Sequence, residues 1–212
     1  KRLFSNNLLR NFVVSDLFIF PPHCPLASDN QYVHLHMHPE LSFKEFRTTQ
    51  KIKNLLTPLG IEIIDMRIET GVVGLLKGKY DGPTVALRGD IDALPILEET
   101  DVEYKSTIDG VMHACGDDTH TTALAGAALI LSEIRDELHG NVKFIFQLAE
   151  EKNAGAKMLV EAGGMDDVDV IFGLHNHPDV PAGKMGVKLG GLMAAVDTIW
   201  KRGTWRNTSK NY

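Results

Sequence analysis

The sequence predicts an α/β fold, a mostly parallel sheet with helices on both faces. Two observations lead to this prediction. Short apolar and β-branched runs alternate with segments of helical periodicity, which is the pattern of strand–helix–strand units. The run at 142–148 (VKFIFQL) is apolar almost throughout, as expected for a strand that is covered on both sides.

The first predicted helix begins near Ser42. Residues Ser42 to Glu45 (SFKE) fit a capping box, in which the Ser hydroxyl and the Glu carboxylate satisfy backbone N–H groups at a helix start. An apolar face continues from there to Gly60, and glycine commonly ends helices. We therefore expect a helix capped by Ser42 and Glu45 that ends at Gly60.

Strands and two further helices complete the pattern. Five strands are expected from runs of apolar and β-branched residues that turn residues separate, at 61–66, 72–76, 84–88, 142–148 and 168–174. The last of them is apolar enough to be buried. A long helix, rich in Ala and Leu, is expected over 119–138 with Asp118 as its N-cap, and a shorter helix over 154–162.

The overall composition argues against several classes of function. The chain has 212 residues and a formal net charge of -6, whereas a nucleic-acid or anionic-membrane binder needs a basic patch. It contains no run of about 18 apolar residues, so no transmembrane helix is predicted. Cys24 and Cys115 do not make a disulfide framework, and a reducing, cytoplasmic location is the simpler prediction.

Polar clusters follow the predicted strands, where a parallel sheet places its active site. These clusters are Asp90 and Asp92; Cys115, Asp117, Asp118 and His120; Glu150 and Glu151; and His175 and His177. Thiolate, imidazole and carboxylate groups are ligands for Zn²⁺ and similar ions. Two adjacent glutamates divide naturally into a ligand and a general base. The sequence therefore predicts a metal site at this edge of the sheet.

Five sequence blocks resemble those of a known family, in the family's order. They are HMHPELSF at 36–43, RGDIDALP at 88–95, MHACGDDTHT at 112–121, QLAEE at 147–151 and GLH at 173–175. Together they resemble the amidohydrolase branch of the aminoacylase–carboxypeptidase metallopeptidases. That branch includes hippurate hydrolases, N-acyl-amino-acid amidohydrolases and indole-acetyl-amino-acid hydrolases. The resemblance divides the chain into an atypical lead-in, 1–31, a partial catalytic domain, 32–197, and an unmatched tail, 198–212.

The resemblance implies a ligand set for two divalent metal ions, Mn²⁺ or Zn²⁺. Cys115 would bridge the ions, with Glu151 and His175 as further ligands. At position 117 the family has a metal-binding histidine, and Asp117 is expected to bind in its place.

The resemblance also implies a reaction, which is hydrolysis of the amide bond of an N-acyl amino acid. Glu150 would be the general base that activates a metal-bound water, and Asp92 would orient the site. No nucleic-acid or membrane partner is expected.

Past residue 197 the family continues into a lid and dimerisation domain, and the chain then returns with a last metal-binding histidine. This sequence matches neither feature, so we expect an incomplete catalytic domain, and both an active chain and an inactive fragment stay open. A full-length relative would form a homodimer through the lid domain.

Two other functions stay open. One is a pseudoenzyme that binds metal or an acyl amino acid without turnover, and the other is an aminopeptidase of related fold, against which the Cys115-Gly116 block argues. His36 is expected to support the start of the helix after it. For His113, His120 and His177 a role beside the site and a structural role both stay open.

Overall fold

The computed structural model describes residues 31–181, 183–186, 195–201 and 204–210, and side chains as far as residue 186. Cys24 and nearly all of the predicted lead-in lie outside these residues. The chain divides into two compact units, Lys1–Asn176 and His177–Tyr212. In the second unit, β6 (Ala195–Lys201) and β7 (Thr204–Lys210) form an antiparallel hairpin.

A five-stranded mixed sheet forms the centre of the first unit, with the order β1-β2-β4-β3-β5. Its strands are β1 (Glu62–Ile64), β2 (Val72–Lys77), β3 (Tyr80–Asp90), β4 (His139–Gln147) and β5 (Val170–Gly173). β3 is parallel to both β4 and β5, whereas β2 is antiparallel to β1 and to β4. Residues 65–71 between β1 and β2 are too few for a parallel crossover, so this edge is antiparallel. The predicted α/β class is confirmed, with a mixed sheet.

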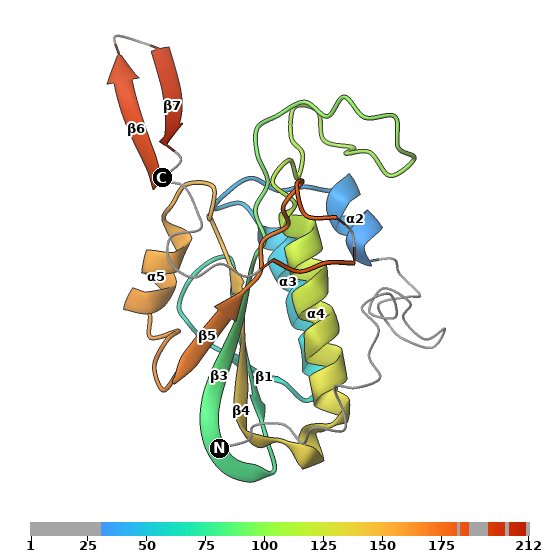
Figure 1. Cartoon of the computed structure of the whole chain (residues 1–212), viewed down its shortest axis with the longest axis vertical. Coiled ribbons are helices and arrows are strands. Elements are labelled where there is room, and N and C mark those ends of the chain that lie inside the picture. Colours follow the sequence, from blue (N-terminus) through green and yellow to red (C-terminus); the bar gives the residue numbers. More distant parts are fainter. Residues whose placement is uncertain (1–30, 182, 187–194, 202–203, 211–212) are drawn as a thin grey trace. The chain divides into compact units, whose positions relative to one another are not determined.

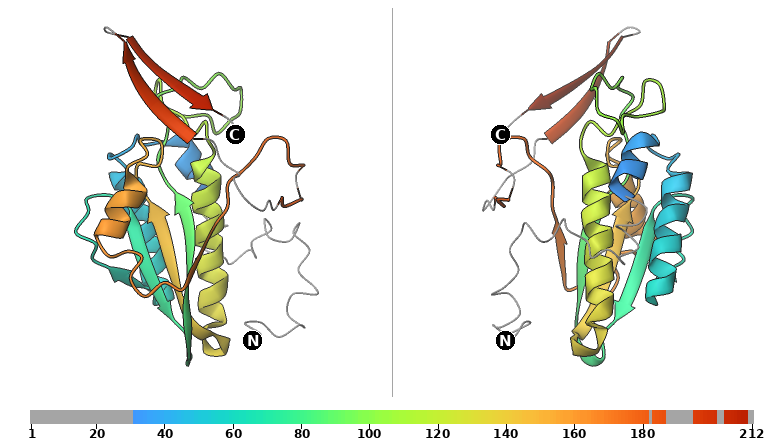
Figure 2. Two further views of the ribbon diagram at one scale, coloured as in Figure 1. Left: turned by 60° about the vertical axis from the view of Figure 1, so that its left-hand side comes forward. Right: turned by 90° about the vertical axis from the view of Figure 1, so that its right-hand side faces the viewer.

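Helices cover both faces of this sheet (Figures 1 and 2). They are α2 (Gln31–Met37), α3 (Phe46–Leu56), α4 (Asp117–Glu133) and α5 (Gly155–Glu161), with 3₁₀ turns at Thr57–Leu59 and Arg135–Glu137. Successive residues of β4 point to opposite faces. Phe144 and Phe146 belong to the core that α3 and α4 cover, and Ile145 belongs to the core beside α5.

The predicted capping box at Ser42 and Glu45 is wrong. The N–H groups of Arg47 and Thr48, in the first turn of α3, donate instead to the carboxylate of Glu40, at 3.1 and 2.8 Å. Ser42 donates to Asp92, and Glu45 accepts a hydrogen bond from the backbone of residue 149. Tertiary partners therefore replace the local ones, and both side chains face the carboxyl edge of the sheet.

The long helix α4 begins at Asp117, two residues before the predicted start, and ends at Glu133. Its N-cap is Gly116, in the left-handed region with φ of 96°, so the N-cap role predicted for Asp118 is wrong. Asp118 lies within the helix, and its Oδ2 atom is 2.6 Å from Nδ1 of His36. This contact joins α2 to the first turn of α4, which agrees with the supporting role predicted for His36.

β5 is exposed, although the sequence predicts a buried strand. Its apolar residues include Phe172, which is 58% exposed, and Ile171, which is 43% exposed. β5 is the last strand in the sheet order and pairs only with β3 in that sheet. An apolar run predicts a strand but not whether other elements cover it.

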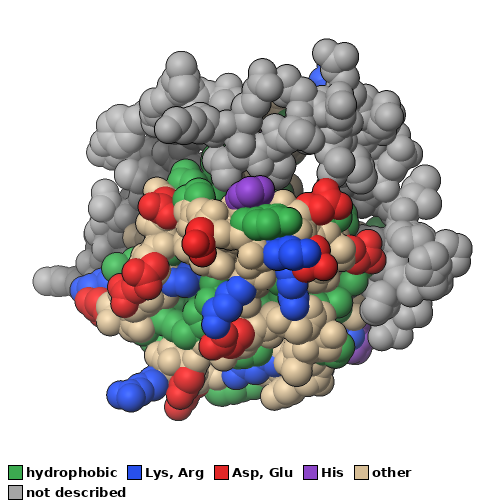
Figure 3. All heavy atoms as spheres, turned by 90° about the horizontal axis from the view of Figure 1, so that it is seen from below, with side chains coloured by type: hydrophobic (Ala, Val, Ile, Leu, Met, Phe, Trp, Pro, Cys, Tyr) green, Lys and Arg blue, Asp and Glu red, His purple; other side chains and the backbone are tan. Residues whose placement is uncertain are grey.

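The described surface mixes charges of both signs. On the face in Figure 3, acidic and basic side chains alternate and do not gather by sign. Among the residues that were searched, no helix has the length and apolar character needed to cross a membrane.

We expect Phe146→Ala to lower the free energy of unfolding by about 3–5 kcal/mol, because Phe146 is fully buried between the sheet and its helices. Urea unfolding followed by circular dichroism measures the change. Phe46→Ala is the matched control, since Phe46 is 53% exposed, and we expect its effect to stay within about 0.5 kcal/mol. Equal losses in the two variants would contradict this assignment of the core.

Candidate metal centre

The carboxyl edge of the sheet gathers the polar clusters that the sequence predicts. Asp90 ends β3 and Asp92 follows it, Glu150 and Glu151 follow β4, and His175 follows β5. Cys115 and Asp117 lie at the start of α4, at the same upper end of the unit in Figure 1. Parallel strands β3, β4 and β5 end at one edge, which is why residues far apart in the sequence meet there.

The four predicted metal ligands converge on one another. Ligand atoms of Cys115, Asp117 and Glu151 all lie within 4.8 Å of one another. The Sγ atom of Cys115 is 3.3 Å from Nε2 of His175, which adds the fourth residue. The proximity that the sequence predicts is therefore present, and the roles of these residues as ligands stay predictions.

These residues fit a divalent cation. Both carboxylate oxygens of Asp117 and Oε1 of Glu151 are buried, and no group in the described part of the chain hydrogen-bonds to them. A buried carboxylate oxygen without a partner is unfavourable by about 1–3 kcal/mol or more. A cation among the oxygens and the sulfur would remove this penalty, because thiolate, imidazole and carboxylate are its usual ligands.

Without a cation, this group holds protons at neutral pH. Burial, reinforced by Asp90 and Asp92, raises the pKa of Asp117 to about 10. Burial and the adjacent Glu150 charge raise the pKa of Glu151 to about 7. Burial likewise raises the pKa of the Cys115 thiol, with Glu151 and Asp117 adding to the effect. Metal binding would therefore release protons from the site.

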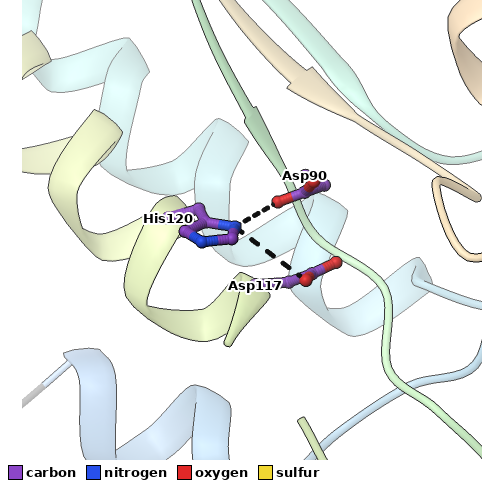
Figure 4. A group of neighbouring side chains, drawn as sticks. All are labelled: Asp90, Asp117 and His120. Carbon is purple, nitrogen blue, oxygen red and sulfur yellow. Dashed lines mark hydrogen bonds and ion pairs between the residues drawn. The ribbon is translucent and has the colours of Figure 1, made fainter. Parts of the chain in front are cut away.

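A second group, Asp90, Asp117 and His120, also brings potential ligand atoms within 4.8 Å (Figure 4). Here the ligand atoms of Asp90 and His120 already have protein partners. His120 is 2.6 Å from Asp90 through Nδ1, and its Nε2 accepts the N–H of Asn176 at 2.8 Å. Arg88 forms an ion pair with Asp90 at 2.7 Å. We therefore assign the Asp90–His120 pair to support of the site and not to metal binding.

Charge compensation separates the two buried aspartates. Burial acts to raise the pKa of Asp90, but the His120 hydrogen bond and the Arg88 charge outweigh it and hold that pKa below its usual value. Asp117 accepts no hydrogen bond from the described residues, and Nδ1 of His120, which pairs with Asp90, is 3.9 Å from it, so its pKa rises. The contrast identifies Asp117 as the carboxylate that lacks a close counter-charge.

Two buried carboxylates hold the loop that carries both glutamates. Asp92 accepts the N–H groups of Glu150 at 2.8 Å and Glu151 at 3.1 Å. Glu45 accepts the preceding N–H, that of Ala149, at 2.8 Å. Ala149 has φ of 46°, a left-handed conformation that costs a non-glycine residue roughly 1–2 kcal/mol. Asp92 therefore lies where it can orient the two glutamates, as the resemblance implies. Glu45 also holds this loop, a role that the capping-box prediction did not include.

The remaining histidines occupy different places. His36 lies between Asp118 and Glu98, at 2.6 and 3.2 Å. Burial acts to lower its pKa, but these two carboxylates raise it overall. His113 is buried, which lowers its pKa. His177 belongs to the second unit, where its Nδ1 accepts the N–H of Asp179 at 3.3 Å.

The chain is similar to several known proteins. Residues 86–210 match the model of Peptidase family M20/M25/M40. The chain is 54% identical over 164 residues to N-acetylcysteine deacetylase of Bacillus subtilis (strain 168), covering 77% of this chain and 43% of the relative. It is 45% identical over 170 residues to N-acyl-L-amino acid amidohydrolase of Geobacillus stearothermophilus, covering 80% of this chain and 46% of the relative.

A solved structure is also similar, that of the YXEP protein of Bacillus subtilis, a dinuclear metal-binding peptidase of the M20 family. It superimposes with a TM-score of 0.77 and 52% sequence identity, over 80% of this chain and 48% of that one. The chain therefore spans less than half the length of these relatives. The family match covers more than half of this chain and confirms the resemblance: the chain belongs to Peptidase family M20/M25/M40.

Proposed function

We propose that this chain carries the metal centre of a hydrolase that cleaves the amide bond of N-acyl amino acids. The observation that carries the proposal is the group of Cys115, Asp117 and Glu151, in which three buried carboxylate oxygens accept no hydrogen bond from the described residues. The names of two relatives support the substrate class, since they specify N-acetylcysteine and N-acyl-L-amino acids. The homodimer of a full-length relative and the cytoplasmic location stay predictions.

Cys115, Asp117, Glu151 and His175 would hold two divalent ions, Mn²⁺ or Zn²⁺. The dinuclear metal-binding relative supports the number of ions. Such ions act as Lewis acids, which polarise a carbonyl group and make water more acidic. Soft thiolate and imidazole ligands suit Zn²⁺, and the two carboxylates suit Mn²⁺ equally well.

Glu150 is the proposed general base. Burial, together with the Asp90 charge, raises its pKa, and a base with a pKa nearer neutrality accepts and returns a proton more readily. Glu150 would take a proton from the water that attacks the acyl carbon. It would then pass the proton to the amine nitrogen as the C–N bond breaks, leaving a carboxylate and a free amino acid. Asp92 fixes the backbone of this base through the Glu150 N–H.

A second candidate is a binding protein that holds metal or an acyl amino acid without turnover. The aspartate at position 117, where the resembling family has histidine, favours it. A carboxylate in place of a neutral imidazole gives the set a third anionic ligand beside Cys115 and Glu151, which weakens the Lewis acidity of a bound ion. Metal binding with and without hydrolysis separates the two candidates.

Metal content tests the centre directly. We expect the purified chain, loaded with Zn²⁺ or Mn²⁺ and dialysed, to approach two ions per chain by mass spectrometry of the metal. Asp117→Ala and Glu151→Ala should weaken binding by at least about 10–100-fold, the loss that even supporting residues produce. Glu99→Ala is the control, since Glu99 is an exposed acid. A wild-type chain that retains no ion would overturn the proposed centre.

Substitution of Glu150 tests the base. We expect Glu150→Gln to lower hydrolysis of N-acetyl, N-benzoyl or indole-acetyl amino acids by about 10²–10⁴-fold while metal content is unchanged. The exposed Glu161 on α5 offers the control Glu161→Gln. Undiminished turnover in Glu150→Gln would refute the assigned base. Metal and substrate binding without turnover in the wild-type chain would favour the binding protein.

The pKa of Asp117 predicts how the metal-free chain responds to pH. Its folded-state pKa of about 10 lies above the ordinary value of about 3.9, so the folded state holds an extra proton between these values. Stability is then lost as pH rises through that window. Asp117→Asn mimics the protonated form, and we expect its melting temperature to exceed that of the wild-type chain by a margin that grows between pH 5 and pH 9. Differential scanning fluorimetry with a chelator measures this, and a margin that shrinks with pH would contradict the assignment.

A further inference from the structure

Asn176 contacts both sides of the candidate metal centre, although sequence analysis did not identify it. It directly follows His175, and its carbonyl oxygen is 2.6 Å from Nδ1 of His175. Its side-chain Nδ2 donates to the carbonyl oxygen of Cys115 at 3.0 Å. Its backbone N–H donates to Nε2 of His120 at 2.8 Å. Two of these hydrogen bonds link the loop after β5 to the start of α4, and the third lies within that loop.

The buried end of this chain of contacts is anchored. Because the Asn176 N–H is a donor, Nε2 of His120 must be the acceptor, and the proton of a neutral ring is then on Nδ1. That Nδ1–H donates to Asp90, at 2.6 Å, and Asp90 also pairs with Arg88 at 2.7 Å. Both Asp90 and His120 are 1% exposed. The backbone of Asn176 is therefore held by a hydrogen bond to a buried pair of side chains and not by surface groups.

The contact with His175 selects a tautomer. A carbonyl oxygen only accepts hydrogen bonds, so Nδ1 of His175 carries the proton and its Nε2 lone pair is free. That Nε2 lies 3.3 Å from Sγ of Cys115. This is the tautomer that a metal-binding Nε2 requires, and a backbone carbonyl on the other ring nitrogen is the usual way to hold it.

The contact with Cys115 explains the glycine beside it. Gly116 has φ of 96°, and a Cβ atom built there would lie 2.0 Å from Nδ2 of Asn176. The amide of Asn176 therefore occupies space that only a glycine leaves open. The same close approach lets the amide reach the Cys115 carbonyl and fix the backbone that carries the thiol.

We infer that Asn176 is a positioning residue that holds Cys115 and His175 toward each other, and that Asp90 and His120 set its place. The inference rests on the proposed metal centre. The competing assignment makes His120 itself a ligand, as its proximity to Asp117 in Figure 4 allows. The two assignments predict different effects of His120→Gln on metal binding.

Cobalt substitution supplies the test, because a thiolate bound to Co²⁺ has a charge-transfer absorption that reports on Cys115. We expect the wild-type chain to show this band and Cys115→Ser to lose it. Asn176→Ala should weaken Co²⁺ binding by about 10–100-fold and reduce the band at equal loading. Asn54→Ala, a change of an exposed asparagine on α3, should leave both unchanged.

Two substitutions of His120 form the matched pair. The carboxamide oxygen of His120→Gln can replace Nε2 as the acceptor for Asn176, whereas the shorter His120→Asn can reach Asp90 but not Asn176. We expect His120→Gln to keep wild-type cobalt binding and His120→Asn to behave like Asn176→Ala. Equal loss of the band in both His120 variants would show that His120 is a ligand and would overturn the inference.

Thermal unfolding of each metal-free variant checks the fold. If His120→Asn fails to fold, cobalt binding by Asn176→Asp tests the inference in its place. This change keeps the size of the side chain and removes the donor to the Cys115 carbonyl oxygen. Wild-type cobalt binding in both Asn176 variants would overturn the inference while leaving the metal centre intact. A wild-type chain that binds no Co²⁺ would instead refute the proposed function.

Discussion

The two oxygens of the Asp92 carboxylate accept consecutive backbone N–H groups, those of Glu150 and Glu151, and the geometry of the site depends on this contact. It joins the segment after β3 to the loop after β4, which carries both glutamates. Ser42 donates to the same carboxylate at 2.6 Å, which adds the segment before α3. Ala149, in its left-handed conformation, is retained because Glu45 holds its N–H from the other side. A strained loop with this support can aim side chains accurately.

The two buried aspartates at this edge differ in charge compensation: Asp90 is the compensated part of the negative charge and Asp117 the uncompensated part. Asp90 has Arg88 and His120 as partners and keeps a lowered pKa. Asp117 lies nearby with no hydrogen bond from the described residues and with Nδ1 of His120 only as close as 3.9 Å, and its pKa rises to about 10. In a metal-free chain the second part carries protons, and a divalent cation would replace them. The compensated part can then be rigid in both states, which suits its role in holding Asn176.

Much of the fold could be predicted because it follows from local pattern. The apolar run that includes Phe144 and Phe146 is a central strand, and its alternate side chains fill two cores. Burial of β5 could not be predicted in the same way, since an apolar run does not reveal whether another element covers it. The start of α4 also differs from the prediction, because the N-cap is Gly116 in a left-handed conformation and not Asp118.

The sequence by itself determined the family, the α/β class and the residues that meet at the carboxyl edge. Parallel strands end together, and the blocks around Cys115, Glu150 and His175 are distinctive enough to identify. Only the tertiary structure decided which polar residues support the others. Glu45 and Ser42 fit a local cap by spacing, yet their partners lie 104 and 50 residues away in the sequence. His120 and Asn176 meet across 56 residues. A hydrogen bond depends on distance in space, and sequence spacing reports that distance only within one helix or strand.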